Sequence, residues 1–181
     1  MLTIPVGHTL AALASILGDV DEVSSVLSTR RSTARALDTN QTLPVTAPDQ
    51  VLVSGKLQGG APLSLDYRGG MARDGEGFVW EINGTAGDIK VFGPFGHPQL
   101  VQLTIKGAKG DEKSFRPLEV PQALRADFPE EVVPGNVARA YKKMANDLRE
   151  HTHTAPDFDQ AVALHRVLAA IEQAARVHTP I

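Results

Sequence analysis

Apolar residues near the N-terminus fall on one side of a helix and are followed by a glycine. These residues are Leu10, Leu13, Ile16, Leu17 and Gly18. The spacing predicts a short amphipathic helix that ends at the glycine, after an extended apolar run with the sequence TIPV. Pro5 fixes its own backbone angle and Gly7 permits a close turn. We therefore expect His8 at the start of this helix, not buried along it.

The pattern changes to short β-prone runs between about residues 21 and 122. Glycine and proline separate these runs, which are EVSSVLSTR, QVLVSGKLQ, APLSLDYRGG, GFVWEING, GDIKVFG and LVQLTIKG. Apolar residues alternate at Val51 and Val53 and again at Leu63, Leu65 and Tyr67, which predicts strands with two different faces. The stretch INGTAGDIK predicts a tight turn between two paired strands.

Helical spacing returns after Pro134. One side of a first helix carries Val137, Tyr141, Met144 and Leu148, and one side of a last helix carries Ala161, Leu164, Leu168, Ile171 and Ala175. Asp157 and Gln160 form a predicted capping box for the last helix. A helix, many strands and two helices indicate an α+β fold with a mainly antiparallel sheet. The linker HTHTAP is too short to separate domains, so we expect residues 1–181 to form one domain.

The amino-acid composition makes several classes of function unexpected for this chain. The 181 residues include 18 basic and 21 acidic side chains, a formal charge of −3, and no block of like charges. General affinity for nucleic acid or for anionic lipid is therefore not expected. The chain has no cysteine, which excludes disulfides and a thiolate nucleophile and is typical of a cytoplasmic protein. No basic leader and no apolar run of about 18 residues is present, so we expect neither secretion nor membrane insertion.

Three segments in the same order resemble the C-terminal domain of the Gfo/Idh/MocA oxidoreductases, especially the fungal, Gal80-like branch. The segments are TIPVGHTLAALASILG, EINGTAGDI and PDFDQAVALHRVLAAIEQAA. The resemblance implies an open sheet with helices packed on one face, while the other face makes the subunit contact. It also implies that substrate lies between this domain and an N-terminal Rossmann domain that binds NAD(P). No nucleotide-binding domain is recognisable in these 181 residues.

Within this resemblance, His8 matches the family histidine that lies near the substrate hydroxyl and acts as acid or base. An imidazole suits proton transfer because its ordinary pKa of about 6.5 lies near cellular pH. Many family members carry an aspartate four residues earlier, where this chain has Ile4. The family lysine has no identifiable counterpart. Because the chain starts only a few residues before His8, the strand that usually opens the domain is expected to be missing.

No cofactor is expected to bind this chain alone. A G-x-G-x-x-G stretch between a strand and a helix, which would hold a dinucleotide phosphate, is not found in the sequence. The glycine-rich stretches LQGGAP and RDGEGF do not lead into helices, so both are interpreted as turns. Unless another polypeptide supplies the cofactor domain, these residues are not expected to transfer hydride.

Substrate-binding candidates are Tyr67, Arg73 and Trp80. Tyr67 and Trp80, together with Phe78, lie on predicted strands and could form an aromatic wall for a ligand, although core or interface packing is the commoner role of such residues. Arg73 could bind a carboxylate or phosphate, as could Arg30, Arg31 and Arg68, although most such arginines are only solvated. The group His151, His153, Asp157 and Asp159 does not have the spacing of a metal site, so no metal is predicted.

Three functions remain open. The first is a free-standing small-molecule-binding protein that catalyses a non-redox reaction, as an isomerase, cyclase or dehydratase, with His8 as acid or base. The second is the substrate-binding and dimerisation half of an NAD(P)-dependent dehydrogenase. The third is a non-enzymatic, Gal80-like regulatory or assembly module. A homodimer is expected through the sheet, because helices on one side could not hide the apolar layer of Val51, Val53, Leu63 and Leu65.

Overall fold

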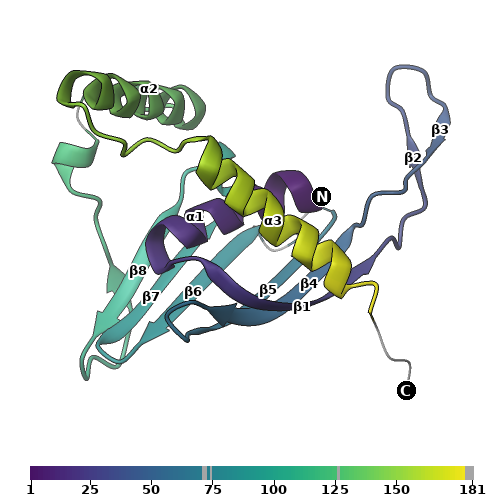
Figure 1. Cartoon of the computed structure of the whole chain (residues 1–181), viewed down its shortest axis with the longest axis horizontal. Coiled ribbons are helices and arrows are strands. Elements are labelled where there is room, and N and C mark those ends of the chain that lie inside the picture. Colours follow the sequence, from purple (N-terminus) through teal and green to yellow (C-terminus); the bar gives the residue numbers. More distant parts are fainter. Residues whose placement is uncertain (71–72, 74, 126, 178–181) are drawn as a thin grey trace. The chain divides into compact units, whose positions relative to one another are not determined.

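The computed structural model describes residues 1–70, 73, 75–125 and 127–177. The chain divides into two compact units. Unit 1 consists of Met1–Gly70 and Phe158–Ile181, and unit 2 consists of Met71–Asp157. Each unit contains its own antiparallel sheet, and helices complete both, so the class is α+β as predicted (Figure 1). The units are described separately below.

Unit 1 combines a three-stranded sheet with two helices from opposite ends of the sequence. The sheet has the order β1-β4-β5, and a separate hairpin is formed by β2 and β3. The elements are α1 (Gly7–Leu17), β1 (Val20–Ser28), β2 (Thr33–Arg35), β3 (Thr42–Pro44), β4 (Gln50–Leu57), β5 (Pro62–Arg68) and α3 (Phe158–Ala174). The predicted strands at β1, β4 and β5 and the predicted last helix are confirmed.

The segment before α1 is helical, so the prediction of an extended run was wrong. Leu2–Val6 forms one turn of π-helix with Pro5 inside it, and the amide of Gly7 donates to the carbonyls of Leu2 and Ile4. Proline has no N–H, which favours a locally widened turn over a regular α-helical one. Gly7 itself has φ −58° and ψ −44°, ordinary α-helical angles. The close turn expected at Gly7 is therefore absent, and α1 continues directly from the π-turn until Gly18 ends it at φ 93°.

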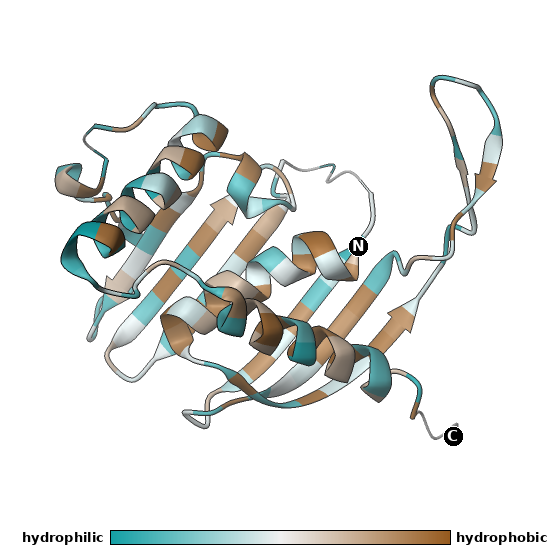
Figure 2. Cartoon of the chain, turned by 45° about the horizontal axis from the view of Figure 1, so that its top comes forward, coloured by the Kyte–Doolittle hydropathy of each residue, from teal (hydrophilic) through white to brown (hydrophobic). Residues whose placement is uncertain are grey.

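The inner face of the β1-β4-β5 sheet lies under α1 and α3 and forms the core of unit 1 (Figures 1 and 2). Strand pairing places Ser25, Val53 and Leu65 side by side on this face. The core residues are Leu2, Val6, Leu10, Val51, Val53, Leu65, Leu168 and Ile171. The predicted exposed apolar layer was thus misplaced, because Val51 and Val53 are only 0% and 3% exposed. The outer face carries Val26 and Leu52 in a mainly polar surrounding.

The hairpin formed by β2 and β3 was not predicted. Each strand has only three residues, and every residue of both strands is exposed. Neither apolar alternation nor an Asn-Gly or Asp-Gly turn marks it in the sequence. Leu37, beyond β2, is fully exposed.

Unit 2 contains a four-stranded sheet with the order β6-β7-β8-β9. Its elements are β6 (Phe78–Gly84), β7 (Gly87–Gly93), β8 (Thr104–Lys109), β9 (Arg116–Pro117) and α2 (Val132–Glu150), with short 3-10 turns at Pro98–Leu100 and Gln122–Leu124. The predicted tight turn is confirmed, because only two residues separate β6 from β7 and Gly87 has φ 149°. The run LVQLTIKG is a strand only from Thr104, and β9 was not predicted.

Asp147 organises the chain between α2 and α3. Its carboxylate accepts hydrogen bonds from the hydroxyls of Thr152 and Thr154, at 2.6 and 2.8 Å, and from the amides of Thr154 and Ala155, at 2.9 and 2.6 Å. These bonds, first that of the Thr152 hydroxyl, hold the pKa of Asp147 well below its usual range. The linker HTHTAP is therefore an ordered turn.

A search of the helices over the described residues finds none with the length and apolar character that a bilayer crossing requires.

Gly55→Ala should destabilise the protein. An added Cβ at Gly55 would lie 2.0 Å from the backbone oxygen of Glu22, so β1 and β4 would have to move apart. We expect a loss of about 1–3 kcal/mol in the free energy of unfolding, measured by urea denaturation. Gly59→Ala is the matched control, because nothing lies within 4 Å of its added Cβ. Equal stability of the two variants would contradict this packing.

Asp147→Asn should loosen the turn after α2. The lowered pKa means that the carboxylate stabilises the folded turn above the unfolded-state pKa of about 3.9 and loses this effect as the pH falls through the lower folded value. Asparagine keeps the shape of the side chain but replaces one hydrogen-bond acceptor with a donor. We expect faster amide hydrogen exchange at Thr154 and Ala155, with the exposed Asp111→Asn as control. Unchanged exchange in both variants would refute the role of Asp147.

Candidate functional site

His8 lies in the first turn of α1 with its side chain exposed, between two buried neighbours, Gly7 and Thr9. This placement follows from the helix, because Val6, Leu10 and Leu13 occupy the side that packs in the core. Ile4, four residues earlier, is 61% exposed and offers no carboxylate to orient or share a proton with the imidazole. The assignment of His8 as acid or base stays a prediction.

Tyr67 is anchored to α1 by Thr9, a residue that sequence reasoning missed. The phenol oxygen of Tyr67 lies 2.7 Å from the hydroxyl of Thr9, and this hydrogen bond joins β5 to the helix. Burial raises the pKa of Tyr67, while its hydrogen bond with Thr9 acts in the opposite direction. In the sequence, only the position of Thr9 in the predicted helix, between His8 and Leu10, could have indicated this role.

The first turn of α1 therefore presents two kinds of polar chemistry. His8 offers an exposed imidazole, whose ring nitrogens can donate or accept a hydrogen bond. The Thr9 and Tyr67 hydroxyls are already bonded to each other, so their first role is to fix α1 on the sheet. Each hydroxyl keeps further capacity to donate or accept a hydrogen bond. Such a turn can bind a polar group.

The other predicted substrate-binding residues belong to unit 2. Arg73 is exposed in the segment between β5 and β6. Trp80 is half-buried on β6, opposite Val91 of β7, and shares its face with the buried Phe78. His8 and Tyr67 belong to unit 1. The predicted aromatic wall is therefore divided between the units, and the roles of Tyr67, Arg73 and Trp80 stay predictions.

One of the candidate arginines has a structural role. The Asp49 carboxylate accepts hydrogen bonds from the amides of Arg30 and Arg31, which lowers the pKa of Asp49. The guanidinium of Arg31 donates to the carbonyl of Gly69 at 3.1 Å. Asp49 and Arg31 thus tie the start and the end of the β2–β3 hairpin to the end of β5.

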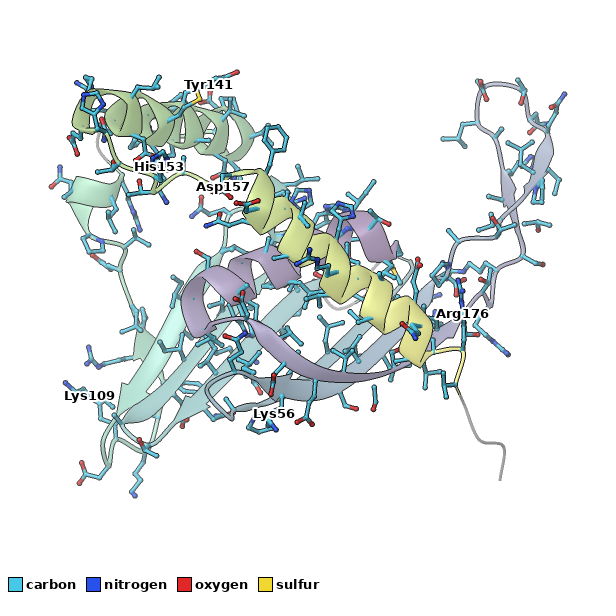
Figure 3. All side chains as sticks on the ribbon, viewed as in Figure 1. Lys56, Lys109, Tyr141, His153, Asp157 and Arg176 are labelled. Carbon is cyan, nitrogen blue, oxygen red and sulfur yellow. The ribbon has the colours of Figure 1, made fainter. Side chains whose placement is uncertain are left out.

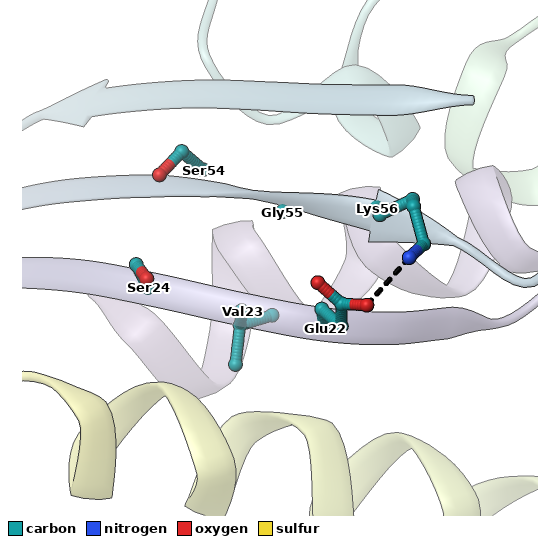
Figure 4. A pocket seen from close by; sticks show the side chains of 6 residues that line it. All are labelled: Glu22, Val23, Ser24, Ser54, Gly55 and Lys56. Atoms are coloured by element: carbon teal, nitrogen blue, oxygen red, sulfur yellow. Dashed lines mark hydrogen bonds and ion pairs between the residues drawn. The ribbon is translucent and has the colours of Figure 1, made fainter. Parts of the chain in front are cut away.

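A shallow groove of about 590 Å³ lies along β1 and β4 and was not predicted (Figure 4). Its lining residues are Glu22, Val23, Ser24, Ser54, Gly55 and Lys56. Ser24 pairs with Ser54 and Glu22 with Lys56, on the sheet face opposite the core. The Lys56 ammonium donates to Glu22 at 2.5 Å, which raises the pKa of Lys56. The small side chains of two serines and a glycine leave the space open.

The described residues contain no group of three His, Asp or Glu side chains that could hold a metal ion. The exposed His151 ends α2 with a left-handed backbone, at φ 54°. His153 is also exposed, two residues further along the same turn (Figure 3). Their proximity in the sequence thus reflects the geometry of a helix end.

The family of the Gal80p C-terminal domain matches residues 1–93, just over half of the chain. The chain belongs to this family. A curated relative, the galactose/lactose metabolism regulatory protein GAL80 of Kluyveromyces lactis, is 31% identical over 108 residues, which cover 55% of this chain and 24% of that protein. The family assignment confirms the resemblance predicted from the three sequence segments.

Two solved structures extend the likeness over nearly the whole chain. The super-repressor mutant E351K of Gal80p from Saccharomyces cerevisiae superposes with a TM-score of 0.82, at 20% identity, over 100% of this chain and 49% of that chain. Levoglucosan dehydrogenase in complex with NADH and levoglucosan gives a TM-score of 0.71 at 20% identity, over 94% of this chain and 47% of that chain. At such identities the likeness establishes the Gfo/Idh/MocA C-terminal fold. The chain spans about half the length of these proteins.

Thr9→Val and Tyr67→Phe should each lower the free energy of unfolding by about 1 kcal/mol, because each removes the part-buried hydrogen bond between the two hydroxyls. The double variant should cost less than the sum, with a coupling of at least about 0.5 kcal/mol in a double-mutant cycle. Thr3→Val, at an exposed position of the π-turn, should have little effect. Strict additivity would mean that the hydrogen bond between Thr9 and Tyr67 does not contribute to stability.

Proposed function

We propose that this chain is a Gal80-like regulatory or assembly module, which acts by binding another protein and not by catalysis. The observation that carries the proposal is its membership of the Gal80p C-terminal domain family. The relative at 31% identity is itself described as a metabolic regulatory protein. A regulatory protein needs a stable surface that binds its partner, and it does not need catalytic groups.

The geometry around His8 agrees with this proposal. Ile4 replaces the carboxylate that many enzymes with this fold are expected to place near the histidine, and its exposed position offers no substitute. The hydrogen bond between Thr9 and Tyr67 attaches α1 to β5, which suits a stable binding surface.

Catalysis is the competing proposal. Levoglucosan dehydrogenase shares the fold and binds NADH and levoglucosan according to its description. At 20% identity this likeness does not transfer an activity. Two catalytic functions therefore remain as alternatives: non-redox catalysis by His8, and a role as the substrate-binding half of a dehydrogenase. The experiment below distinguishes both of them from regulation.

A subunit contact through the outer face of the β1-β4-β5 sheet remains part of the proposal, but with other residues than first expected. Val26 and Leu52 are neighbours on paired strands and are both exposed on this face. The groove beside them has the small side chains of Ser24 and Ser54 in its lining, together with the Glu22–Lys56 ion pair. A flat surface with a small apolar centre is suited to a second sheet.

His8→Ala should leave protein binding unchanged. A tagged chain is expressed in its native host, partners are covalently cross-linked and identified, and the complex is rebuilt from purified proteins for calorimetry. We expect a defined stoichiometry and a Kd that changes by less than about twofold in the variant, since most exposed side chains contribute little to a protein interface. His8→Gln serves as the matched polar control.

The same preparations are assayed with NAD, NADP and small polyols. Turnover by the purified chain that falls about 10²-fold or more in His8→Ala would overturn the regulatory proposal, because that loss is typical of a general acid or base. Failure to rebuild any stoichiometric complex would also contradict it.

A further inference from the structure

Helix α2 presents a continuous apolar side to solvent. The residues on this side are Val133, Val137, Tyr141, Met144 and Leu148, all between 47% and 73% exposed. Their spacing of four, four, three and four residues places them in one stripe along the helix. Figure 3 marks Tyr141 near the middle of the stripe. Contiguous exposed apolar surface of this kind generally marks an interface.

The contacts of α2 within unit 2 come from its polar side. Gly135 lies so close to the carbonyl of Pro129 that an added Cβ would be 2.6 Å from it. The side chain of Asn136 donates to the carbonyl of Gln99 at 3.0 Å. Arg139 and Lys142 lie over the ring of Phe128, at 4.9 and 5.0 Å from its centre. These contacts hold the helix in place from sides other than the apolar stripe.

We propose that the apolar stripe of α2 pairs antiparallel with the same stripe of a second copy of this chain. The stripe is self-complementary in this orientation, because one register matches Val133 with Leu148 of the other copy and Val137 with Met144. The same register brings the two Tyr141 residues to within one residue of each other across the two-fold axis. Spacings of three and four residues between successive apolar positions are typical of a two-helix coiled coil.

Charge favours the antiparallel orientation. In this register Glu131, exposed at the N-terminal end of α2, lies opposite the last turn of the other copy. Arg149 of that turn lies on the same side of the helix as Glu131, whereas Glu150 lies about 100° further round. The pairing occurs twice by symmetry. A parallel pair would instead place Glu131 beside Glu131 and Arg149 beside Arg149, and like charges repel. Ala138 and Ala145 flank the stripe and allow the two backbones to approach closely.

The association should be weak. A 19-residue helix is about 28 Å long, and two such helices bury less surface than the roughly 1,200 Å² of a standard stable interface. Self-association through α2 does not require that the chain be a regulator, so its failure would leave the proposed function untouched.

Met144→Glu should weaken the dimer by at least about ten-fold, because it places a charge in the centre of the interface. Sedimentation is followed from micromolar to near-millimolar concentration. Lys143→Glu is the matched control with the same new side chain one residue away, and Leu52→Glu tests the outer sheet face. Lys143→Glu should associate like the unaltered chain, and Leu52→Glu, which alters the separate sheet-face contact proposed above, should keep the association through α2. Monomer at every concentration, or a dimer lost in Leu52→Glu but kept in Met144→Glu, overturns the proposal.

Disulfide cross-linking tests the register without reliance on stability. The chain has no cysteine, so each introduced thiol is unique. Val133→Cys and Leu148→Cys should form a disulfide dimer readily when mixed and only slowly alone, whereas Tyr141→Cys should cross-link alone. Lys143→Cys, off the stripe, is the control. Rapid cross-linking of Val133→Cys or Leu148→Cys alone, or equal cross-linking at Lys143, overturns the antiparallel pairing.

Discussion

Burial of the inner face of the β1-β4-β5 sheet is the constraint on which unit 1 depends. A three-stranded sheet with Val51 and Val53 on one side cannot stay exposed to water, and the cover comes from α1 and α3, at opposite ends of the sequence. The hydroxyl of Ser25 donates to the carbonyl of Ile171 at 2.5 Å, a buried link between residues 146 positions apart. The core therefore forms only when both ends of the chain have met the sheet.

The packing of α1 and α3 on the sheet also determines which side chains of α1 are accessible to a ligand or a partner. Leu10 must face the sheet, so Thr9 is held at its margin beside Tyr67 and His8 points outward. The exposure of His8 is thus a consequence of packing and would arise in an enzyme and in a regulator alike. The apolar Ile4 lies four residues before His8 and is also exposed, so the outward side of this turn carries both an apolar side chain and an imidazole.

The sequence pattern predicted most of the framework and little of the site. Alternation predicted β4 and β5 because their inner residues enter a core, and the period of α3 predicted Leu168 and Ile171 for the same reason. The exposed β2–β3 hairpin buries nothing, so no alternation marks it. The π-turn before α1 depends on how Pro5 is accommodated between helical neighbours. The Thr9–Tyr67 bond and the groove beside Gly55 depend on contacts between strands and helices that no local pattern contains.

Helices α2 and α3 show where periodicity stops being informative. Both carry apolar residues on one side, yet the stripe of α3 lies in a core while Tyr141 and Leu148 of α2 are exposed. An amphipathic pattern indicates that one face of a helix packs against a partner. It does not indicate whether that partner lies in the same chain. Because the polar side of α2 already holds it against Phe128 and Gln99, turning the stripe inward would break those contacts. The partner of this face must therefore come from outside unit 2.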